Sequence, residues 1–184
     1  MPRIATIQTK EQIPSEYQHV YDEIAASRGT VGGPWLALLH SPELAQRTAH
    51  LGAFVRFESS LDHRTVELTA LVSARELDCK HEWGAHIGHG ENAGIAPETI
   101  RAVYEKRGAE SFASEDAQIV SLVREILQSH RVSERTFQAL YGRFGEKGFV
   151  ELVATIGYYA MLACTLNTFD VATAAAPAEF QLKS

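Results

Sequence analysis

The chain has 184 residues, 45% of them hydrophobic, which is enough for one domain with a sizeable buried core. Its 17 Lys and Arg against 23 Asp and Glu give a net charge of -6, which provides no basic surface for nucleic acid. The first residues lack the apolar stretch of a signal peptide, and no run approaches the ~20 apolar residues of a membrane span. Two cysteines in no CxxC pair are typical of a reducing compartment. We therefore expect a cytoplasmic protein that has a small-molecule substrate and no nucleic-acid or membrane partner.

The first part of the chain predicts a succession of amphipathic helices. Apolar residues at helical spacing end at Gly29, a residue that suits a helix C-terminus. A helix to about residue 59 is expected to begin at Ser41 and Pro42, with serine as cap and proline in the first turn. Asp62 is expected to cap the next helix, whose apolar stripe surrounds Glu67.

The second part continues in the same way. Asp78 is expected to cap a central helix that has Cys79 in its first turn and ends at Gly94. Shorter helices are predicted over residues 97–106, 114–129 and 133–144. The last helix, over about 147–175, is apolar nearly all round, with Cys164 in the core, so it needs cover from its own bundle or from another subunit.

The fold class predicted from this pattern is all-α. No period-2 alternation or hairpin signal occurs, and short connections join the helices. We expect a bundle of about seven to eight helices forming a single domain over residues 1–184, with a weak internal duplication left open. The tail, residues 176–184, is expected to be frayed or docked on a neighbour.

Reactive side chains concentrate between residues 67 and 94. At about 100° per residue, a helix beginning near residue 79 carries four of them within an arc of roughly 80°: Cys79, Glu82, His86 and His89. Burying such groups costs free energy unless each finds a partner, so a shared functional space is the interpretation. His81 projects away from this face. The helix N-terminus would favour the thiolate of Cys79, although a free cysteine is often an inert core residue.

Proton transfer is the chemistry that these residue types suit. The charge of His86 changes near neutral pH, and Glu82 lies four residues away, within contact distance on a helix. An exposed pair on a solvated face is the alternative. Glu67, if sequestered among apolar residues, should hold its proton more strongly than a free carboxylate. Its alternative is an ion pair with one of the arginines at positions 64 and 75.

A metal or cofactor site has weaker support. Glu82, His86 and His89 have ligand types suited to zinc or iron, but HEWGAH is not the HExxH spacing of zincins. A phosphate-binding loop, a dinucleotide fingerprint and a nucleophile elbow are all missing from the sequence. We therefore expect no metal and no cofactor, with this trio as the metal-binding alternative.

Over most of its length the chain resembles carboxymuconolactone decarboxylases and the related alkylhydroperoxidase D proteins. The resembling segments are Gly33-Pro34-Trp35, His40-Ser41-Pro42-Glu43, the core from Glu67 to His86, Gly94 with Pro97-Glu98, and Gly157-Tyr158 with Asn167. The resemblance implies a helical, cofactor-free enzyme that assembles as a homotrimer or homohexamer.

The peroxidase branch of this family has a glutamate, eleven residues, a CxxC pair, three residues and a histidine. Glu67, Cys79 and His86 match the glutamate, the first cysteine and the histidine, and His81 matches a histidine between the two cysteines. Glu82 stands where the second cysteine should be. A carboxylate cannot resolve a sulfenic acid, so the internal disulfide cycle is excluded, while a reaction with an external thiol stays open.

The decarboxylase branch resembles this sequence in Glu82, Trp83 and His86, and it implies a carboxylated lactone from aromatic ring cleavage as substrate. Loss of CO2 leaves electron density that must be accepted and then protonated. Our hypothesis makes His86 the acid or base, while Glu67 orients or protonates it and Glu82 binds or shuttles protons. Cys79 is an auxiliary group or, in the alternative, the thiol of a hydroperoxide reductase. A non-catalytic oligomeric binding protein is the third hypothesis.

Overall fold

The computed structural model describes residues 1–171 and 174–182, and these residues contain helices and no strand. The all-α prediction is confirmed. Two π-helical turns, Phe54–Glu58 and Glu125–Ser129, extend the third and seventh helices. The α-helices in chain order are α1 (Gln18–Arg28), α2 (Trp35–Leu38), α3 (Pro42–Ala53), α4 (His63–Glu76), α5 (Lys80–Asn92), α6 (Pro97–Tyr104), α7 (Ser114–Arg124) and α8 (Glu134–Phe169).

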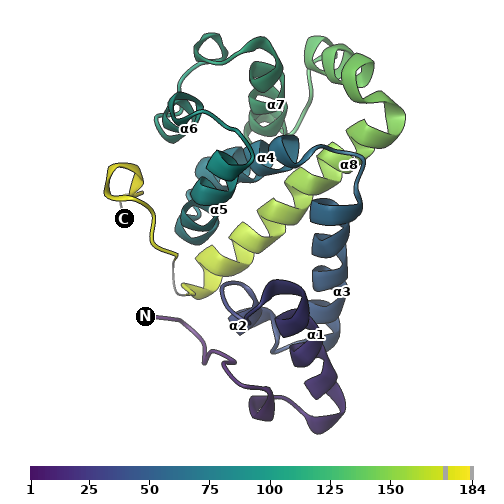
Figure 1. Ribbon diagram of the computed structural model, residues 1–184, viewed down its shortest axis with the longest axis vertical. Helices are drawn as coiled ribbons and strands as arrows, with labels where there is room; N and C mark the ends of the chain where they lie inside the picture. The colour runs from purple at the N-terminus through teal and green to yellow at the C-terminus, as the bar shows by residue number, and fades with distance from the viewer. Residues whose placement is uncertain (172–173, 183–184) are drawn as a thin grey trace.

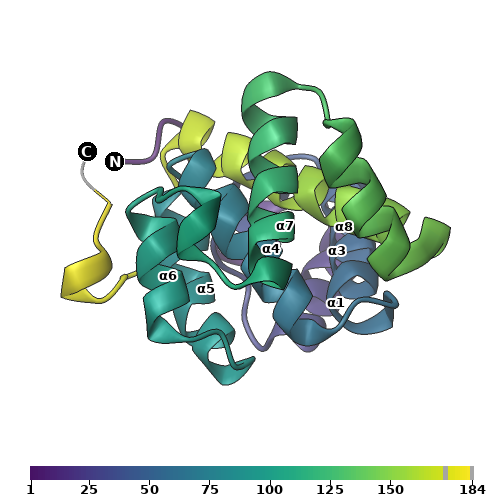
Figure 2. The same cartoon turned by 90° about the horizontal axis from the view of Figure 1, so that it is seen from above.

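Helix α4 is the centre of the molecule. Ten consecutive residues, from Thr65 to Ala74, are buried, so this helix is covered on every side. It packs against α5, α7 and α8. Both views place α5 and α6 on one flank of the α4–α8 pair, and α1 and α3 on the other (Figure 1, Figure 2). A polar side chain on α4 is therefore held in a fixed place by its surroundings.

The start of α4 follows the predicted cap, whereas the start of α5 does not. The Asp62 carboxylate accepts hydrogen bonds from the backbone N–H and the hydroxyl of Thr65, both at 2.8 Å. Asp78 was expected to play the same role for α5, and this prediction is wrong. It adopts a left-handed backbone conformation with φ 49°, and its carboxylate pairs with Arg75. Cys79 is the N-cap residue of α5.

Two helices were predicted over residues 133–144 and 147–175. The interruption between them is confirmed, but the predicted end of the second helix is wrong. Gly145 interrupts α8 with a φ of 64°, which lies outside the helical region. Ser133 caps the first part by accepting a hydrogen bond from the backbone N–H of Thr136 at 3.3 Å. The second part ends at Phe169, where Asp170 turns into the left-handed conformation.

Helix α8 is more apolar than expected, since no stretch of the sequence was predicted to approach a membrane span. By length and composition alone it could span a membrane, although 56% of its most apolar window is buried inside the molecule, as in the core helix of a globular fold. Its outer face exposes Val150 and Val153. Cys164 was expected in the core and is exposed instead, because it lies on this outer face rather than on the face that packs against α4.

The C-terminal segment docks on its own chain. The Phe180 ring is buried between Trp83 and Tyr104, and its carbonyl accepts a hydrogen bond of 2.8 Å from the Trp83 indole. The expectation of a frayed or neighbour-bound tail is thus wrong for residues 176–182. Residues 183–184 lie outside the described part of the chain.

Candidate functional site

A cavity of about 500 Å³ lies where α4, α5 and α8 meet the segment around α2. Aromatic and aliphatic side chains make up much of its wall, including Trp35, Phe57 and Leu162. Its polar groups converge from helices that are far apart in sequence. A concave space that combines apolar walls with convergent polar groups is the usual form of a small-molecule site.

Three of the four side chains predicted as catalytic meet in this cavity. Glu67 comes from α4, and Glu82 and His86 come from successive turns of α5. The His86 Nδ1–H donates to Glu67 Oε2 at 2.7 Å, and His86 Nε2 lies 3.4 Å from Glu82 Oε2. The side chains are almost fully enclosed, since the three residues are only 2%, 4% and 9% exposed in that order. The imidazole is therefore held between two carboxylates.

This arrangement keeps His86 protonated. Burial disfavours the imidazolium and acts to lower the pKa, but the hydrogen bonds to Glu67 and Glu82 outweigh it and raise the pKa of His86 to about 9. Burial is the largest single effect on Glu67 and raises its pKa, but the hydrogen bond from His86 and the charges of His86, His89 and His63 together outweigh it and lower that pKa. The expectation that Glu67 holds its proton more strongly than a free carboxylate is wrong. Its partner is His86, because Arg64 pairs with Asp116 instead.

The sequence reading missed two neighbours of this trio. His63 Nδ1 lies 3.8 Å from Glu67 Oε1, and the Tyr159 ring packs edge-on against the His86 imidazole at 5.0 Å between centroids. His63 could have been found, since it precedes Glu67 by one helical turn. Tyr159 gave no signal, because the α8 pattern around it is uniformly apolar.

Cys79 does not join the trio. Its residue is 0% exposed, it packs with Ala37, Ala163 and Leu166, and it does not line the cavity. Burial raises the pKa of the Cys79 thiol to about 11 against the opposing effect of nearby backbone N–H groups, so the expected bias toward thiolate is absent. The helical projection failed here because the N-cap residue precedes the first regular turn.

His81 lies on the cavity wall, although the projection pointed it away. Its Nδ1 accepts a hydrogen bond of 3.0 Å from the backbone N–H of Ala174. The chain passes very close to its other nitrogen at Gly33, where an added Cβ would lie 2.4 Å from His81 Nε2. Only glycine fits there, and its φ of 57° disfavours other residues as well.

The alternative metal trio of Glu82, His86 and His89 finds no support. His89 lines the cavity, with its ring centroid 5.7 Å from that of His86. Over residues 1–171 and 174–182, however, no three His, Cys, Asp or Glu side chains are grouped so that they could hold a metal ion. Both ring nitrogens of His86 already face carboxylates.

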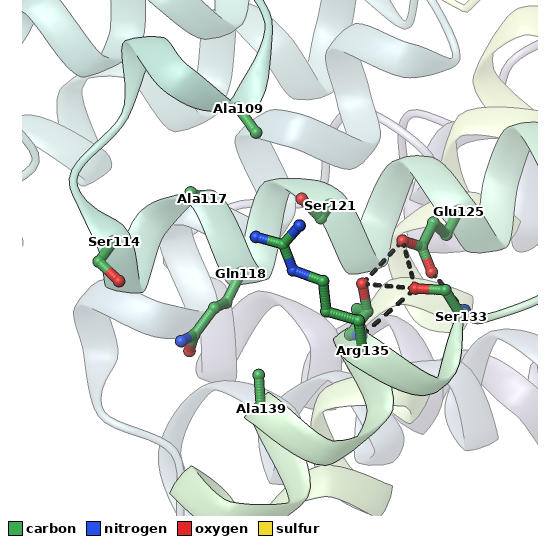
Figure 3. A pocket seen from close by; sticks show the side chains of 10 residues that line it. Ala109, Ser114, Ala117, Gln118, Ser121, Glu125, Ser133, Arg135 and Ala139 are labelled. Carbon is green, nitrogen blue, oxygen red and sulfur yellow. Dashed lines mark hydrogen bonds between the residues drawn. The ribbon is translucent and has the colours of Figure 1, made fainter.

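A second cavity, of about 410 Å³, lies between α7 and the start of α8 (Figure 3). Small side chains line most of it, and Arg135 reaches across it toward Ser121. The Glu125 carboxylate in its wall accepts hydrogen bonds from the Ser133 N–H at 2.6 Å and from the Thr136 hydroxyl at 2.7 Å. Its acidic group thus fixes the beginning of α8, which is a structural role.

Comparison with known proteins gives a family-model match over part of the chain and a shared fold. Residues 42–124 match the model of the carboxymuconolactone decarboxylase family. No curated protein matches the sequence. The structure is similar to an uncharacterized peroxidase-related protein with an alkylhydroperoxidase D core from Ralstonia eutropha, with a TM-score of 0.73 and 17% identity over 97% of this chain and 94% of that one.

Two further solved structures have the same fold. An uncharacterized peroxidase-related protein from a Silicibacter species has a TM-score of 0.73 and 14% identity, covering 99% of this chain and 96% of its own. A protein of unknown function from Agrobacterium tumefaciens has a TM-score of 0.63 and 18% identity, covering 76% and 94%. At these identities the likeness concerns the fold.

Proposed function

We propose that this chain is a member of the carboxymuconolactone decarboxylase and alkylhydroperoxidase D-like superfamily and a cofactor-free enzyme that decarboxylates a carboxylated lactone, which the family-model match over residues 42–124 and the shared fold support. The observation that carries the proposal is the imidazolium of His86, buried between two carboxylates and facing a cavity large enough for a small ring. A proton donor fixed in a partly apolar space is what this reaction needs.

The reaction breaks the bond between the lactone ring and its carboxylate. CO2 leaves, and the electron pair of that bond passes into the conjugated lactone carbonyl. A ring carbon must then take up a proton. With a pKa of about 9, His86 has a proton to give at neutral pH, and a ligand can take its Nε2–H by displacing the longer, 3.4 Å contact to Glu82. The neutral imidazole regains a proton from water.

The two carboxylates have different parts in this scheme. Glu67 accepts the Nδ1–H of His86 at 2.7 Å, so it fixes the ring orientation and stabilises the charged form. Glu82 faces Nε2 from the previous turn and lines the same cavity. In this place it can relay the proton that His86 regains after turnover.

A thiol-dependent hydroperoxide reductase ranks second. A peroxidatic cysteine must reach the peroxide as a thiolate, whereas Cys79 is fully buried, lies outside the cavity wall and has a pKa raised to about 11. The peroxidase-related relatives keep this alternative as one outcome of the test.

The test follows CO2 release from a panel of carboxylated lactones in D2O. We expect CO2 release with one deuterium incorporated into a ring carbon of the product. His86→Asn should lower kcat by roughly 10²- to 10⁴-fold, as loss of a general acid does. Cys79→Ser should retain activity, because the thiol does not reach the cavity.

The opposite pattern would replace the proposal. If the protein consumes organic hydroperoxides with dithiothreitol and Cys79→Ser abolishes that activity, the reductase alternative holds. If neither the lactones nor the hydroperoxides are turned over, the superfamily fold serves here as a binding protein.

A further inference from the structure

Polar atoms without a protein partner gather on the wall of the His86 cavity. Among the described residues, eight buried side-chain N and O atoms have no hydrogen-bond partner, and five of them belong to residues that line this cavity. These five are Arg28 Nε, Arg28 Nη2, Arg56 Nη2, Tyr158 Oη and Tyr159 Oη. The Tyr158 hydroxyl and the Arg28 guanidinium are close enough to interact with each other, which takes up only part of this hydrogen-bonding capacity. Buried donors are normally paired, so such a concentration in one cavity indicates a ligand that pairs with them.

Both guanidinium groups lie over aromatic rings. The Arg28 guanidinium lies 4.4 Å from the centroid of the Trp35 ring, and that of Arg56 lies 4.8 Å from the centroid of Phe57. Arg56 Nε also donates to the carbonyl of Gly52 at 3.1 Å. These ring contacts restrain both groups, and Arg28 Nε, Arg28 Nη2 and Arg56 Nη2 make no hydrogen bond in the protein. A fixed guanidinium edge matches the two oxygens of a carboxylate.

Gly52 allows this group of side chains to assemble. It lies on α3 against α8, and a Cβ there would be 2.2 Å from the Tyr158 hydroxyl and 2.8 Å from Arg28 Nη2. The Tyr158 hydroxyl therefore lies close to the Arg28 guanidinium, in the space next to the backbone of residue 52. Donors from α1 and α8 meet at one place.

The charges of the cavity do not cancel. Glu67 and Glu82 both face His86, and within the described part of the chain neither Arg28 nor Arg56 has an acidic partner within 4.0 Å. Burial lowers the pKa of Arg28, and the positive charge of Arg56 acts in the same direction, against the raising effect of the neighbouring Tyr158 hydroxyl. Three cationic groups thus face two carboxylates. Arg28 and Arg56 are half-buried, so a charge without a counter-ion is costly there, and one anion would remove the excess.

We propose that Arg28 and Arg56, with the hydroxyl of Tyr158, form a carboxylate-binding subsite in the His86 cavity. Where the proposed decarboxylation holds, this subsite takes a carboxylate that the reaction leaves in place. A carboxylate held by two guanidiniums is stabilised as an anion, which would oppose its loss as CO2. The leaving carboxylate therefore belongs elsewhere in the cavity, and the substrate carries a second acidic group.

Benzoate is a suitable probe, because it is a planar ring with one carboxylate that cannot react here. Binding is followed through the two tryptophan indole N–H signals in 1H–15N NMR. Trp35 stacks on Arg28 and should shift in a saturable way. Trp83 donates to the Phe180 carbonyl, away from the cavity wall, and should not move. Benzamide, which has the same shape without the charge, should shift neither signal.

Substitutions separate the subsite from general charge effects. Arg28→Gln and Arg56→Gln should each weaken benzoate binding by about tenfold or more. Arg28→Lys keeps the positive charge but loses the planar pair of N–H donors, so benzoate affinity should fall to an intermediate value. This conservative variant also serves as a control for misfolding. Arg47→Gln removes the same charge from an exposed position on α3 and should bind benzoate like the wild type.

Several results would overturn the subsite. One is the absence of a Trp35 shift with benzoate. Another is equal benzoate binding by Arg28→Gln and Arg47→Gln. The third is benzoate binding that survives Arg28→Gln and Arg56→Gln but is lost in His86→Asn. The outcome is independent of turnover. Benzoate binding without CO2 release from any lactone would keep the subsite and refute the proposed function. CO2 release that depends on His86, without arginine-dependent benzoate binding, would do the reverse.

Discussion

Glu67 and Glu82 raise the pKa of His86, so the charge of the cavity depends on pH in a defined way. Its folded-state pKa of about 9 lies above the ordinary 6.5, so its stabilising contribution is complete below about pH 6.5 and is lost as the pH rises through about 9. The pKa of Glu67 is lowered from 4.5, so its contribution is present above 4.5 and is lost as the pH falls through the folded value. Between these limits both partners are charged.

Replacing Glu67 by glutamine should lower the pKa of His86. Glutamine keeps a hydrogen-bond acceptor but removes the negative charge that favours the imidazolium, while burial still opposes it. The 15N chemical shifts of the His86 ring should therefore show deprotonation at a lower pH than the wild-type value of about 9. The high-pH limb of the kcat/KM profile should move with it.

Glu91→Gln is the matched control for this measurement. It makes the same charge change on an exposed part of α5 and should leave the His86 titration in place. A His86 ring that titrates at the same pH in Glu67→Gln and in the wild type would contradict the role given to Glu67.

The spacing on one helix was enough to bring Glu82 and His86 together, but not to place Cys79. Residues four apart must share a face inside α5, whatever the exact start of the helix. The orientation of Cys79 depends on where α5 begins. The helix begins one residue later than predicted, because Asp78 adopts a left-handed backbone conformation that no sequence pattern indicates. Arg28 and Arg56 were beyond sequence reasoning, because α1 and the turn after α3 approach α8 only in the folded chain.

At the scale of the elements, capping residues located several boundaries, although Asp78 does not cap α5 and the Ser41 side chain makes no capping hydrogen bond at α3. Asp62 and Ser133 each accept a hydrogen bond from a backbone N–H three residues on, and Gly29 ends α1 with a φ of 78°. These are local interactions, so a few residues determine them. The tail was misjudged because the cleft for Phe180 is formed by Trp83 and Tyr104, from helices distant in sequence.

The break in α8 gives a clean test of backbone strain. Gly145 has a φ of 64°, and a Cβ there would meet no atom within 4 Å, so Gly145→Ala changes the backbone preference and little else. With a φ of 64° and a ψ of -175°, Gly145 lies in a backbone region that is essentially confined to glycine, so alanine should lower the free energy of unfolding by about 1–3 kcal/mol. Urea denaturation followed by circular dichroism measures this difference.

Gly142→Ala is its counterpart in the same helix. Gly142 has no positive φ and equally open surroundings, so alanine should stabilise the protein there by about 0.5–1 kcal/mol. Opposite signs at positions 142 and 145 are the expected result. Equal effects at the two positions would mean that α8 continues through Gly145 without a break.

At the scale of the whole molecule, the outer face of α8 has more apolar surface than a single chain covers. Val150 is 69% exposed and Val153 is 43% exposed, one helical turn apart. Cys164 and Gly157 continue the same face toward the C-terminus, and both are exposed. Burying one valine is worth roughly 1.5–3 kcal/mol, so association that covers this stripe is favourable.

We therefore expect the protein to assemble with copies of itself through this stripe, as a homotrimer or homohexamer. Light scattering after size-exclusion chromatography should give a multiple of the chain mass of 20.3 kDa. The double substitution Val150→Glu and Val153→Glu places like charges across the contact and should yield the single-chain mass. Ala26→Glu, a similar change at an exposed position on α1, should leave the assembly intact. A wild-type protein at 20.3 kDa, or a double variant that keeps the larger mass, would show that another surface or none is used.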